Sequence, residues 1–313
     1  MDADSYLKTG SNELRVLEYR VAGLSFGINI LKVSKIIKDL TEFTKVPESH
    51  PAIAGMFRDM NRVIPVVDLL TILGLRSDKS VREKLVVTEF FGMLCGFWVD
   101  RVDWIHHFKW EDVIDATSVF KGINNKYTIG IVKPSEERML QLLDYEKILL
   151  DLTPHLQEGN LSTYQGDTGF TGRRVLVAED SPAVRAMLVT EMKSLGFDVK
   201  ETSDGRKAWE AYQAGSFDLV ISDVEMPQMD GLALTLKIRQ SDRPDTPVIV
   251  YSSIGDMGMK ARARFLNVDA HVTKLNLDEL LRTADKLMRG EKFDNGSAAD
   301  PVNEPEAEAM AVS

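Results

Sequence analysis

With 313 residues, the chain is long enough for two domains that each bury a hydrophobic core. Its 48 acidic and 38 basic side chains give a net charge of −10, which repels phosphate backbones and argues against a nucleic-acid partner. Its apolar runs are shorter than the roughly 20 residues of a membrane-spanning helix, and its polar first residues are unlike a secretory signal. We therefore expect a cytoplasmic protein that does not insert into the membrane.

The first half of the sequence shows the pattern of short β-strands. Apolar stretches are separated by turn-like positions such as Ala22-Gly23 and Gly92, as in hairpins. A brief helix is expected at residues 68–75. The pattern favours an all-β antiparallel barrel, or a pair of barrels, over residues 1–151. The strands are expected at residues 14–21, 24–30, 55–60, 62–69, 85–92, 93–100 and 127–132.

Two segments lack a sustained hydrophobic period. Residues 152–172 are rich in glycine, threonine and other polar residues, and we expect them to form a linker. Residues 290–313 are acidic and rich in small side chains, so burial of apolar area cannot offset the entropy that folding would cost them. This tail is expected to be disordered.

Strands and amphipathic helices alternate between residues 173 and 289. Five repeats of this kind predict an α/β domain with a doubly wound parallel sheet, whose ligands bind at the carboxyl ends of the strands. The expected strands are 173–179, 197–203, 217–223, 246–252 and 269–274. The expected helices are 183–196, 205–215, 232–240, 257–266 and 277–288.

Charged side chains follow three of these strands. The first strand ends at Glu179 and Asp180, the third at Asp223 and the fifth at Lys274. Magnesium prefers a shell of oxygen ligands, and a divalent cation relieves the repulsion among carboxylates that converge at one sheet edge. The sequence therefore predicts a Mg²⁺ site formed by Glu179, Asp180 and Asp223, with Lys274 offsetting the remaining negative charge.

Asp223 is the candidate nucleophile at this edge. A carboxylate can accept a phosphoryl group as an acyl phosphate when a metal ion neutralises the transferred oxygens. Ser252, at the end of the fourth strand, is placed to hydrogen-bond a phosphoryl oxygen and so to bias a loop between two positions. The backbone carbonyl of Glu225 would complete the protein's share of the metal shell.

The motifs of the second half resemble the receiver domain of response regulators. VLVAEDS, ISDVEMPQMDGL, VIVYSS and HVTK occur in the order and spacing of that family. The resemblance implies a flavodoxin-like fold in which Asp223 is the phosphoacceptor. It also implies that Glu179 and Asp180 hold the metal and that Ser252 and Lys274 contact the phosphoryl group.

Two positions depart from the receiver pattern. Leu275 follows Lys274, where many receivers have proline. His271 stands where receivers usually place an aromatic ring that turns inward on activation. We therefore expect an altered output switch that involves His271 and Ser252.

The first half contains no nucleophile–base pair or phosphate-binding glycine loop, which leaves a binding role. Its segments FGINILKV, GMFRDMNRVIPVVDL and YTIGIVKPSEERMLQLLDYEKIL resemble the CheW-like coupling domain, which consists of two small intertwined β-barrels. The resemblance implies docking onto chemoreceptors and onto the histidine kinase CheA. Met60-Asn61 replaces the family's usual Arg-Gly, and the flanking Arg58 and Arg62 are either partner contacts or ordinary solvated surface.

Together the two halves resemble the CheV family of chemotaxis coupling proteins. We expect a non-enzymatic adaptor, associated with receptor arrays, whose coupling changes when the kinase phosphorylates Asp223. Whether the receiver serves adaptation or drains phosphate as a sink is left open. The alternative is a Mg²⁺-dependent phosphatase of the haloacid dehalogenase type, but its motif has a second Asp two residues after the nucleophile, where this chain has Glu225.

Overall fold

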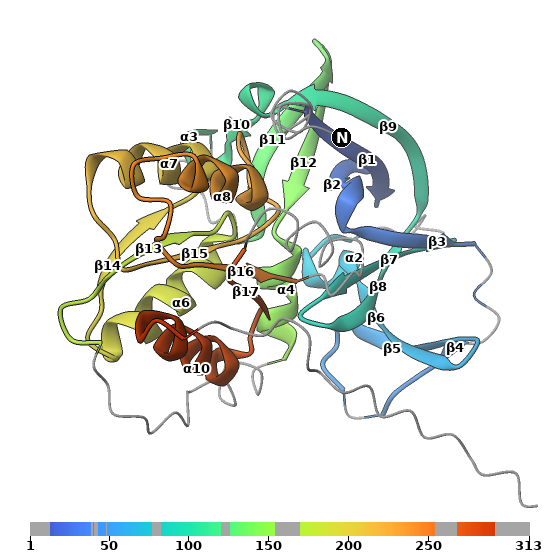
Figure 1. The fold of residues 1–313 in the computed structure, drawn as a ribbon. Coiled ribbons are helices and arrows are strands. Elements are labelled where there is room, and N and C mark those ends of the chain that lie inside the picture. The colour runs from blue at the N-terminus through green and yellow to red at the C-terminus, as the bar shows by residue number, and fades with distance from the viewer. Residues whose placement is uncertain are drawn as a thin grey trace, which may run out of the picture.

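A computed structural model describes residues 13–38, 40, 43–47, 49–76, 83–119, 126–153, 170–253 and 268–291. Two six-stranded sheets form the first half of the chain, and a five-stranded sheet with helices on both faces forms the second half (Figure 1). This arrangement confirms the predicted combination of a β-rich domain and an α/β domain. Below we call them the coupling domain and the receiver.

The first sheet of the coupling domain has the strand order β10-β11-β12-β2-β1-β9. A tight hairpin joins β1 and β2, because Ala22 and Gly23 both adopt positive φ angles, of 54° and 79°. The strands are β1 (Glu13–Val21), β2 (Leu24–Asn29), β9 (Arg101–Lys109), β10 (Ile114–Asp115), β11 (Thr128–Ser135) and β12 (Arg138–Leu143).

The second sheet has the order β3-β7-β8-β6-β5-β4. Its strands are β3 (Val33–Ile37), β4 (Phe43–Thr44), β5 (Ile53–Asp59), β6 (Arg62–Asp68), β7 (Lys84–Phe90) and β8 (Met93–Val99). Short helical turns connect the strands of both sheets: η1 (Ile30–Lys32), α2 (Leu69–Ile72), η2 (Trp110–Asp112) and α3 (Ala116–Val119). The helix expected at residues 68–75 is thus present as the single turn α2.

The expectation of purely antiparallel sheets is wrong at two places. β12 pairs with β2 in parallel, and β6 pairs with β8 in parallel. Neither pair is joined by a hairpin, and a parallel pair requires a longer connection. Hairpin signals in the sequence predict only antiparallel pairs of strands that are close in the chain. They could not predict the two parallel pairs.

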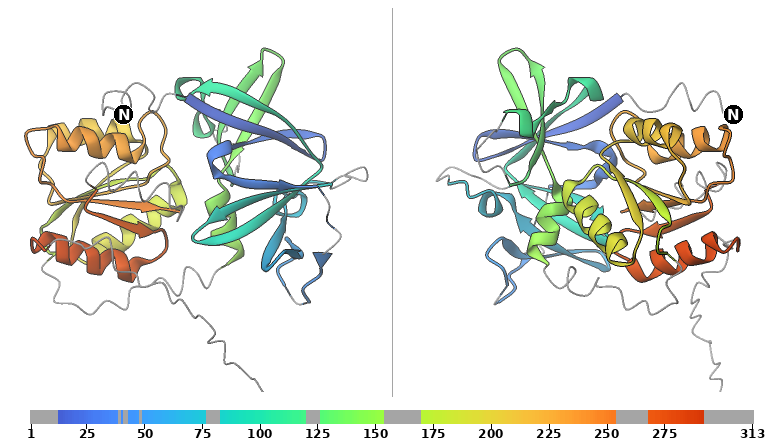
Figure 2. Two further views of the ribbon diagram at one scale, coloured as in Figure 1. Left: turned by 45° about the vertical axis from the view of Figure 1, so that its right-hand side comes forward. Right: turned by 90° about the vertical axis from the view of Figure 1, so that its left-hand side faces the viewer.

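Helix α4 (Tyr145–Leu152) ends the coupling domain and lies against the receiver. Its Tyr145, Ile148 and Leu149 are buried in the core of the coupling domain, whereas Leu150 belongs to the core of the receiver. Both views of Figure 2 show α4 on the side of the coupling domain that faces the receiver. One short helix therefore contributes to two hydrophobic cores.

The receiver sheet is parallel, with the order β14-β13-β15-β16-β17. Its strands are β13 (Arg174–Ala178), β14 (Asp198–Thr202), β15 (Leu219–Ser222), β16 (Val248–Ser252) and β17 (Ala270–Thr273). The central strands are buried along their whole length because helices cover both faces. These helices are α6 (Pro182–Ser194), α7 (Gly205–Ala214), α8 (Gly231–Arg239) and α10 (Leu277–Met288). The helix expected at residues 257–266 lies outside the described residues.

Two described residues of the predicted linker are part of hydrophobic cores. Leu152, the last residue of α4, belongs to the core of the coupling domain, and Phe170 belongs to that of the receiver. Phe170 is 1% exposed and stacks on Phe197, with 4.6 Å between the ring centroids. A phenylalanine isolated among polar residues carries no periodic signal, so the sequence pattern did not separate it from the linker. The rest of the linker from residue 154 to 169, and the tail from residue 292, lie outside the described residues. Among the helices that the structure describes, none combines the length and apolar character needed to cross a bilayer.

Candidate functional site

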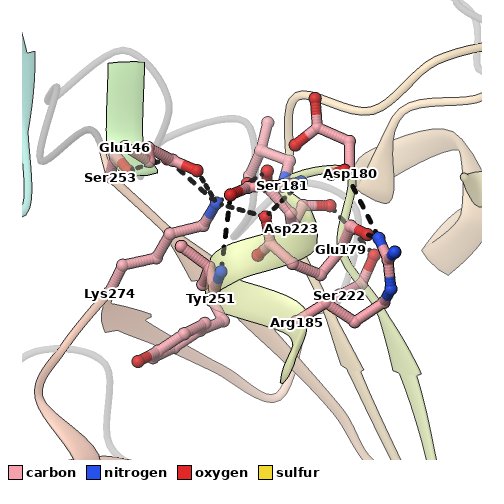
Figure 3. Close-up of polar contacts among 12 residues, drawn as sticks. Glu146, Glu179, Asp180, Ser181, Arg185, Ser222, Asp223, Tyr251, Ser253 and Lys274 are labelled. Carbon is pink, nitrogen blue, oxygen red and sulfur yellow. Dashed lines mark hydrogen bonds and ion pairs between the residues drawn. The ribbon is translucent and has the colours of Figure 1, made fainter. Parts of the chain in front are cut away.

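Two predicted strand-end carboxylates contact the ammonium group of a third strand-end residue, Lys274, at the carboxyl edge of the receiver sheet. Lys274 Nζ lies 2.8 Å from Glu179 Oε1 and 2.9 Å from Asp223 Oδ2. All three side chains are buried. Figure 3 shows the ammonium group of Lys274 between these carboxylates and a further one, Glu146, that approaches from the opposite side.

Backbone contacts fix Asp223 at this edge. Its amide donates to the carbonyl of Ala178 over 2.8 Å, and its Oδ1 accepts from the amide of Val224 over 2.6 Å. The loop after Asp223 returns at Gly231, where a Cβ atom would lie 2.0 Å from the Asp223 carbonyl oxygen. The Asp-Gly pair of the sequence motif thus has a steric reason: Asp230 caps α8, and only glycine fits beside Asp223.

The carboxylates outnumber the positive charge that is buried with them. Burial raises the pKa of Asp223 to about 6, although Lys274 lowers it, and the nearby Asp180 raises it further. Burial likewise raises the pKa of Glu179 well above its ordinary value. For Lys274, burial lowers the pKa, but Asp223 and the other carboxylates raise it more, so the lysine stays charged.

Two carboxylate oxygens in the site lack a hydrogen-bond partner among the described residues. They are Glu179 Oε2 and Asp180 Oδ1, and both atoms are buried. One oxygen each from Glu146, Glu179 and Asp180 lie within 4.8 Å of one another. Carboxylate oxygens at this spacing, in a cluster where two oxygens are unpaired, fit a hard divalent cation.

The predicted and observed groupings of carboxylates differ in one member. We expected Glu179, Asp180 and Asp223 to gather for the metal, whereas the group whose oxygens lie within 4.8 Å of one another has Glu146 in place of Asp223. The two oxygens of Asp223 are turned to Lys274 and to the amide of Val224. The metal roles of these residues, and that of the Glu225 carbonyl, stay predictions.

Ser252 and His271, the two expected switch residues, are adjacent. Ser252 Oγ lies 3.0 Å from His271 Nε2, and Ser252 is 2% exposed. Ser252 lines the same small cavity as Asp223. A group that drew the serine hydroxyl toward Asp223 would therefore also disturb the contact with His271.

The coupling domain contributes residues to this site that the sequence did not indicate. Glu146 Oε1 accepts a hydrogen bond from Ser253 Oγ over 2.8 Å and lies 3.2 Å from Lys274 Nζ. Asp144, which caps α4, accepts from Ser181 Oγ over 3.2 Å. An acidic first turn is ordinary at any helix, so no local pattern distinguishes these carboxylates from solvated ones.

Arg58 and Arg62 lie far from these contacts, on the hairpin of β5 and β6. Both are exposed, and the intervening Met60 has a φ of 51° and is 89% exposed. The structure thus leaves their predicted role in partner binding untested.

Comparison with known proteins places the two domains. Residues 15–152 match the model of the CheW-like domain, and residues 175–285 match that of the response regulator receiver domain. Chemotaxis protein CheV3 of Helicobacter pylori is 31% identical over 299 residues, which cover 88% of this chain and 95% of that protein. The chain belongs to the CheV family. The predicted resemblance is therefore confirmed, and the phosphatase alternative finds no support.

Solved structures resemble the CheV-family chain one domain at a time. The scaffolding protein TtCheW from Thermoanaerobacter tengcongensis is 24% identical and covers 42% of this chain and 88% of its own, with a TM-score of 0.38. The response regulator TrrA from Thermotoga maritima, solved in complex with Mg²⁺ and BeF, is 30% identical. It covers 37% of this chain and 98% of its own, with a TM-score of 0.34.

Proposed function

We propose that this CheV-family adaptor couples chemoreceptors to the histidine kinase CheA and that Asp223 accepts a phosphoryl group in the presence of Mg²⁺. The observation that carries the proposal is the geometry around Lys274. Its ammonium group lies 2.9 Å from Asp223 and 2.8 Å from Glu179, beside two buried carboxylate oxygens that have no other partner among the described residues.

The transfer would break the P–N bond of a phosphohistidine and form a P–O bond to a carboxylate oxygen of Asp223. The imidazole nitrogen of the donor keeps the electron pair of the broken bond and takes up a proton. A bound Mg²⁺, held by Glu179, Asp180 and the Glu225 carbonyl, would neutralise charge on the transferred oxygens. Lys274 remains protonated throughout and can contact both the carboxylate and the phosphoryl group.

In this role the protein is a phosphoacceptor more than an enzyme, because its chemistry is confined to its own aspartate. The coupling domain would supply the contacts to CheA and to the receptors at membrane arrays. Arg58 and Arg62 are candidates for these contacts, since they flank the exposed Met60 on a protruding hairpin.

The proposal can be tested by labelling the full chain from radiolabelled, phosphorylated CheA. We expect rapid Mg²⁺-dependent labelling of the wild type, none for Asp223→Ala, and none when EDTA removes the metal. Asp218→Asn is a matched control, because Asp218 lies at the opposite edge of the sheet and contacts Arg173 and Arg174. Equal labelling of Asp223→Ala and wild type would contradict the assignment of the acceptor.

A further inference from the structure

Glu146 and Asp223 contact the same ammonium group. Lys274 Nζ contacts Asp223 Oδ2 over 2.9 Å and the two oxygens of Glu146 over 3.2 and 3.5 Å. A phosphoryl group bonded to Asp223 would place its own oxygens beside the same ammonium group. The carboxylate of Glu146 thus takes contacts that the modified aspartate would need.

The space that remains next to Asp223 is too small for a phosphoryl group. The cavity at the domain boundary has a volume of about 10 Å³. That is about the minimum for one water molecule, and a phosphoryl group has three oxygens around its phosphorus. Both domains supply the walls, with Lys32 and Glu146 from the coupling domain and Asp223, Ser252 and Ser253 from the receiver.

Charge acts in the same direction as size. Glu146 is 2% exposed, and its negative charge is balanced by Lys274 of the receiver and by Lys32 of its own domain, while Ser253 donates a hydrogen bond to it. A phosphorylated aspartate carries a charge near −2 at neutral pH and would compete for the same partners. It would also repel a carboxylate that is buried beside it.

Glu146 is part of a wider contact between the coupling domain and the receiver. Asp144 accepts from Ser181 at the start of α6, and Leu150 is buried in the receiver core. The turn between β7 and β8 adds Phe91, which packs against both hydrophobic cores. Loss of the Glu146 contact would thus weaken an interface that α4 and this turn share.

We infer that Glu146 occupies the phosphoryl pocket of the receiver from within the chain, so that docking of α4 and phosphorylation of Asp223 exclude each other. The inference rests on the proposed function, in which Asp223 receives the phosphoryl group. Phosphorylation would release the coupling domain from the receiver, and docking would in turn slow phosphorylation. For a bound phosphoryl mimic, thermodynamic linkage requires the mimic to weaken docking of α4 by the same factor by which docking weakens binding of the mimic.

The rate of phosphorylation tests the second half of this statement. The full chain is incubated with Mg²⁺ and acetyl phosphate, a small donor that does not need to dock as the kinase does. We expect Glu146→Gln, which keeps the volume and removes the charge, to be phosphorylated at least about fivefold faster than wild type. The rate from a small donor follows the fraction of undocked molecules, and a coupling at the lower end of the typical range changes that equilibrium about fivefold. Glu146→Ala should be faster still, and Ser253→Ala should shift the rate in the same direction from the receiver side.

Asp151→Asn is the matched control for Glu146→Gln. It removes the same charge from the same helix, but Asp151 contacts Lys126 and Lys147 within the coupling domain, over 2.9 and 3.4 Å. Its rate should equal that of the wild type. An equal increase for both variants would show a general charge effect and would overturn the specific role of Glu146.

Hydrogen exchange tests the release of the domain directly. Mg²⁺ with beryllofluoride serves as the probe, and the amides of α4 and of the turn at Phe91 should exchange faster once it binds the wild type. Unchanged exchange in these segments, with Glu146→Gln phosphorylated at the wild-type rate, would overturn the inference and leave the proposed function intact. Absence of phosphorylation and of beryllofluoride binding in every variant would instead overturn the proposed function, and this inference with it.

Discussion

Two buried clusters of charge in this protein have opposite balances. In the coupling domain, Glu18 is fully buried, and its oxygens contact Arg138, His106 Nε2 over 2.7 Å and Ser25 Oγ over 3.2 Å. In the receiver, Lys274 is shared by several carboxylates, and oxygens of Glu179 and Asp180 lack partners among the described residues. Every oxygen of Glu18 is satisfied, whereas the receiver cluster has an excess of negative charge.

The pKa values express this difference. Burial raises the pKa of Glu18, but the hydrogen bonds from His106 and Arg138 outweigh it, so the pKa is lowered. The pKa of Asp223 is raised to about 6, because burial outweighs Lys274 and because neighbouring carboxylates add to the shift. A satisfied buried carboxylate is typical of a structural contact. A cluster that stays short of positive charge is typical of a site that binds a cation.

The largest effect is expected when the receiver cluster loses its lysine. Lys274→Met leaves buried carboxylates without their shared cation and should lower the local free energy of unfolding by about 3–5 kcal/mol. The matched change, Arg138→Met, should cost about 1 kcal/mol or less, since Arg138 is 41% exposed and Glu18 keeps His106.

Native-state hydrogen exchange measures the two costs separately, in β15 of the receiver and in β1 of the coupling domain. Addition of Mg²⁺ should raise the free energy of unfolding of Lys274→Met by more than that of the wild type. A cost for Arg138→Met as large as that for Lys274→Met would remove the distinction between the clusters.

A smaller effect concerns pH, for which the two clusters should respond with opposite sign. The folded-state pKa of Asp223, about 6, lies above its ordinary value of 3.8. The folded state therefore binds this proton more tightly, and a penalty to stability appears as the pH rises from about 4 to about 6. For Glu18 the lowered pKa stabilises the fold above its ordinary value of 4.5, and this contribution is lost as the pH falls through the folded-state pKa.

In the absence of Mg²⁺, a comparison of Asp223→Asn with the wild type measures the loss of stability caused by the charge of Asp223. The advantage in stability of the variant over the wild type should grow between pH 4 and pH 7 by at most about 3 kcal/mol, the equivalent of a shift of about two pKa units. Exchange rates in β15 at each pH give this difference. An advantage that does not change with pH would mean that Asp223 carries no excess charge in the folded receiver.

The sequence could predict the receiver cluster because its members follow parallel strands. Once strands and helices alternate, the carboxyl ends of the strands must share one edge, and Glu179, Asp223 and Lys274 come together without knowledge of any other contact. Local patterns of this kind also predicted the α/β fold of the receiver and the hairpins of the coupling domain.

Glu146 could not be predicted in this way. It lies 128 positions from Lys274, and their contact depends on how two separately folded domains dock. The parallel pairing of β12 with β2 likewise depends on closure of the sheet between distant segments, which no local period encodes. In both cases the contact depends on how distant segments pack together in space. Strand and helix patterns predict the elements but not this packing.

A neutral replacement of Glu18 in the satisfied cluster should have a modest effect on stability and none on phosphorylation. Glu18→Gln keeps the shape of the side chain but weakens the contacts to Arg138 and His106, which should cost about 1–3 kcal/mol. Exchange in β1 measures this loss, and Asp223 should still be phosphorylated by acetyl phosphate at the wild-type rate, since Glu18 touches only its own domain. Glu146→Gln makes the same chemical change in the receiver cluster, and it should increase the rate of phosphorylation of Asp223. A change in that rate for Glu18→Gln would show that a fully paired carboxylate in the coupling domain also affects phosphorylation of the receiver. The balance of charge in a buried cluster would then not distinguish a structural contact from a functional site.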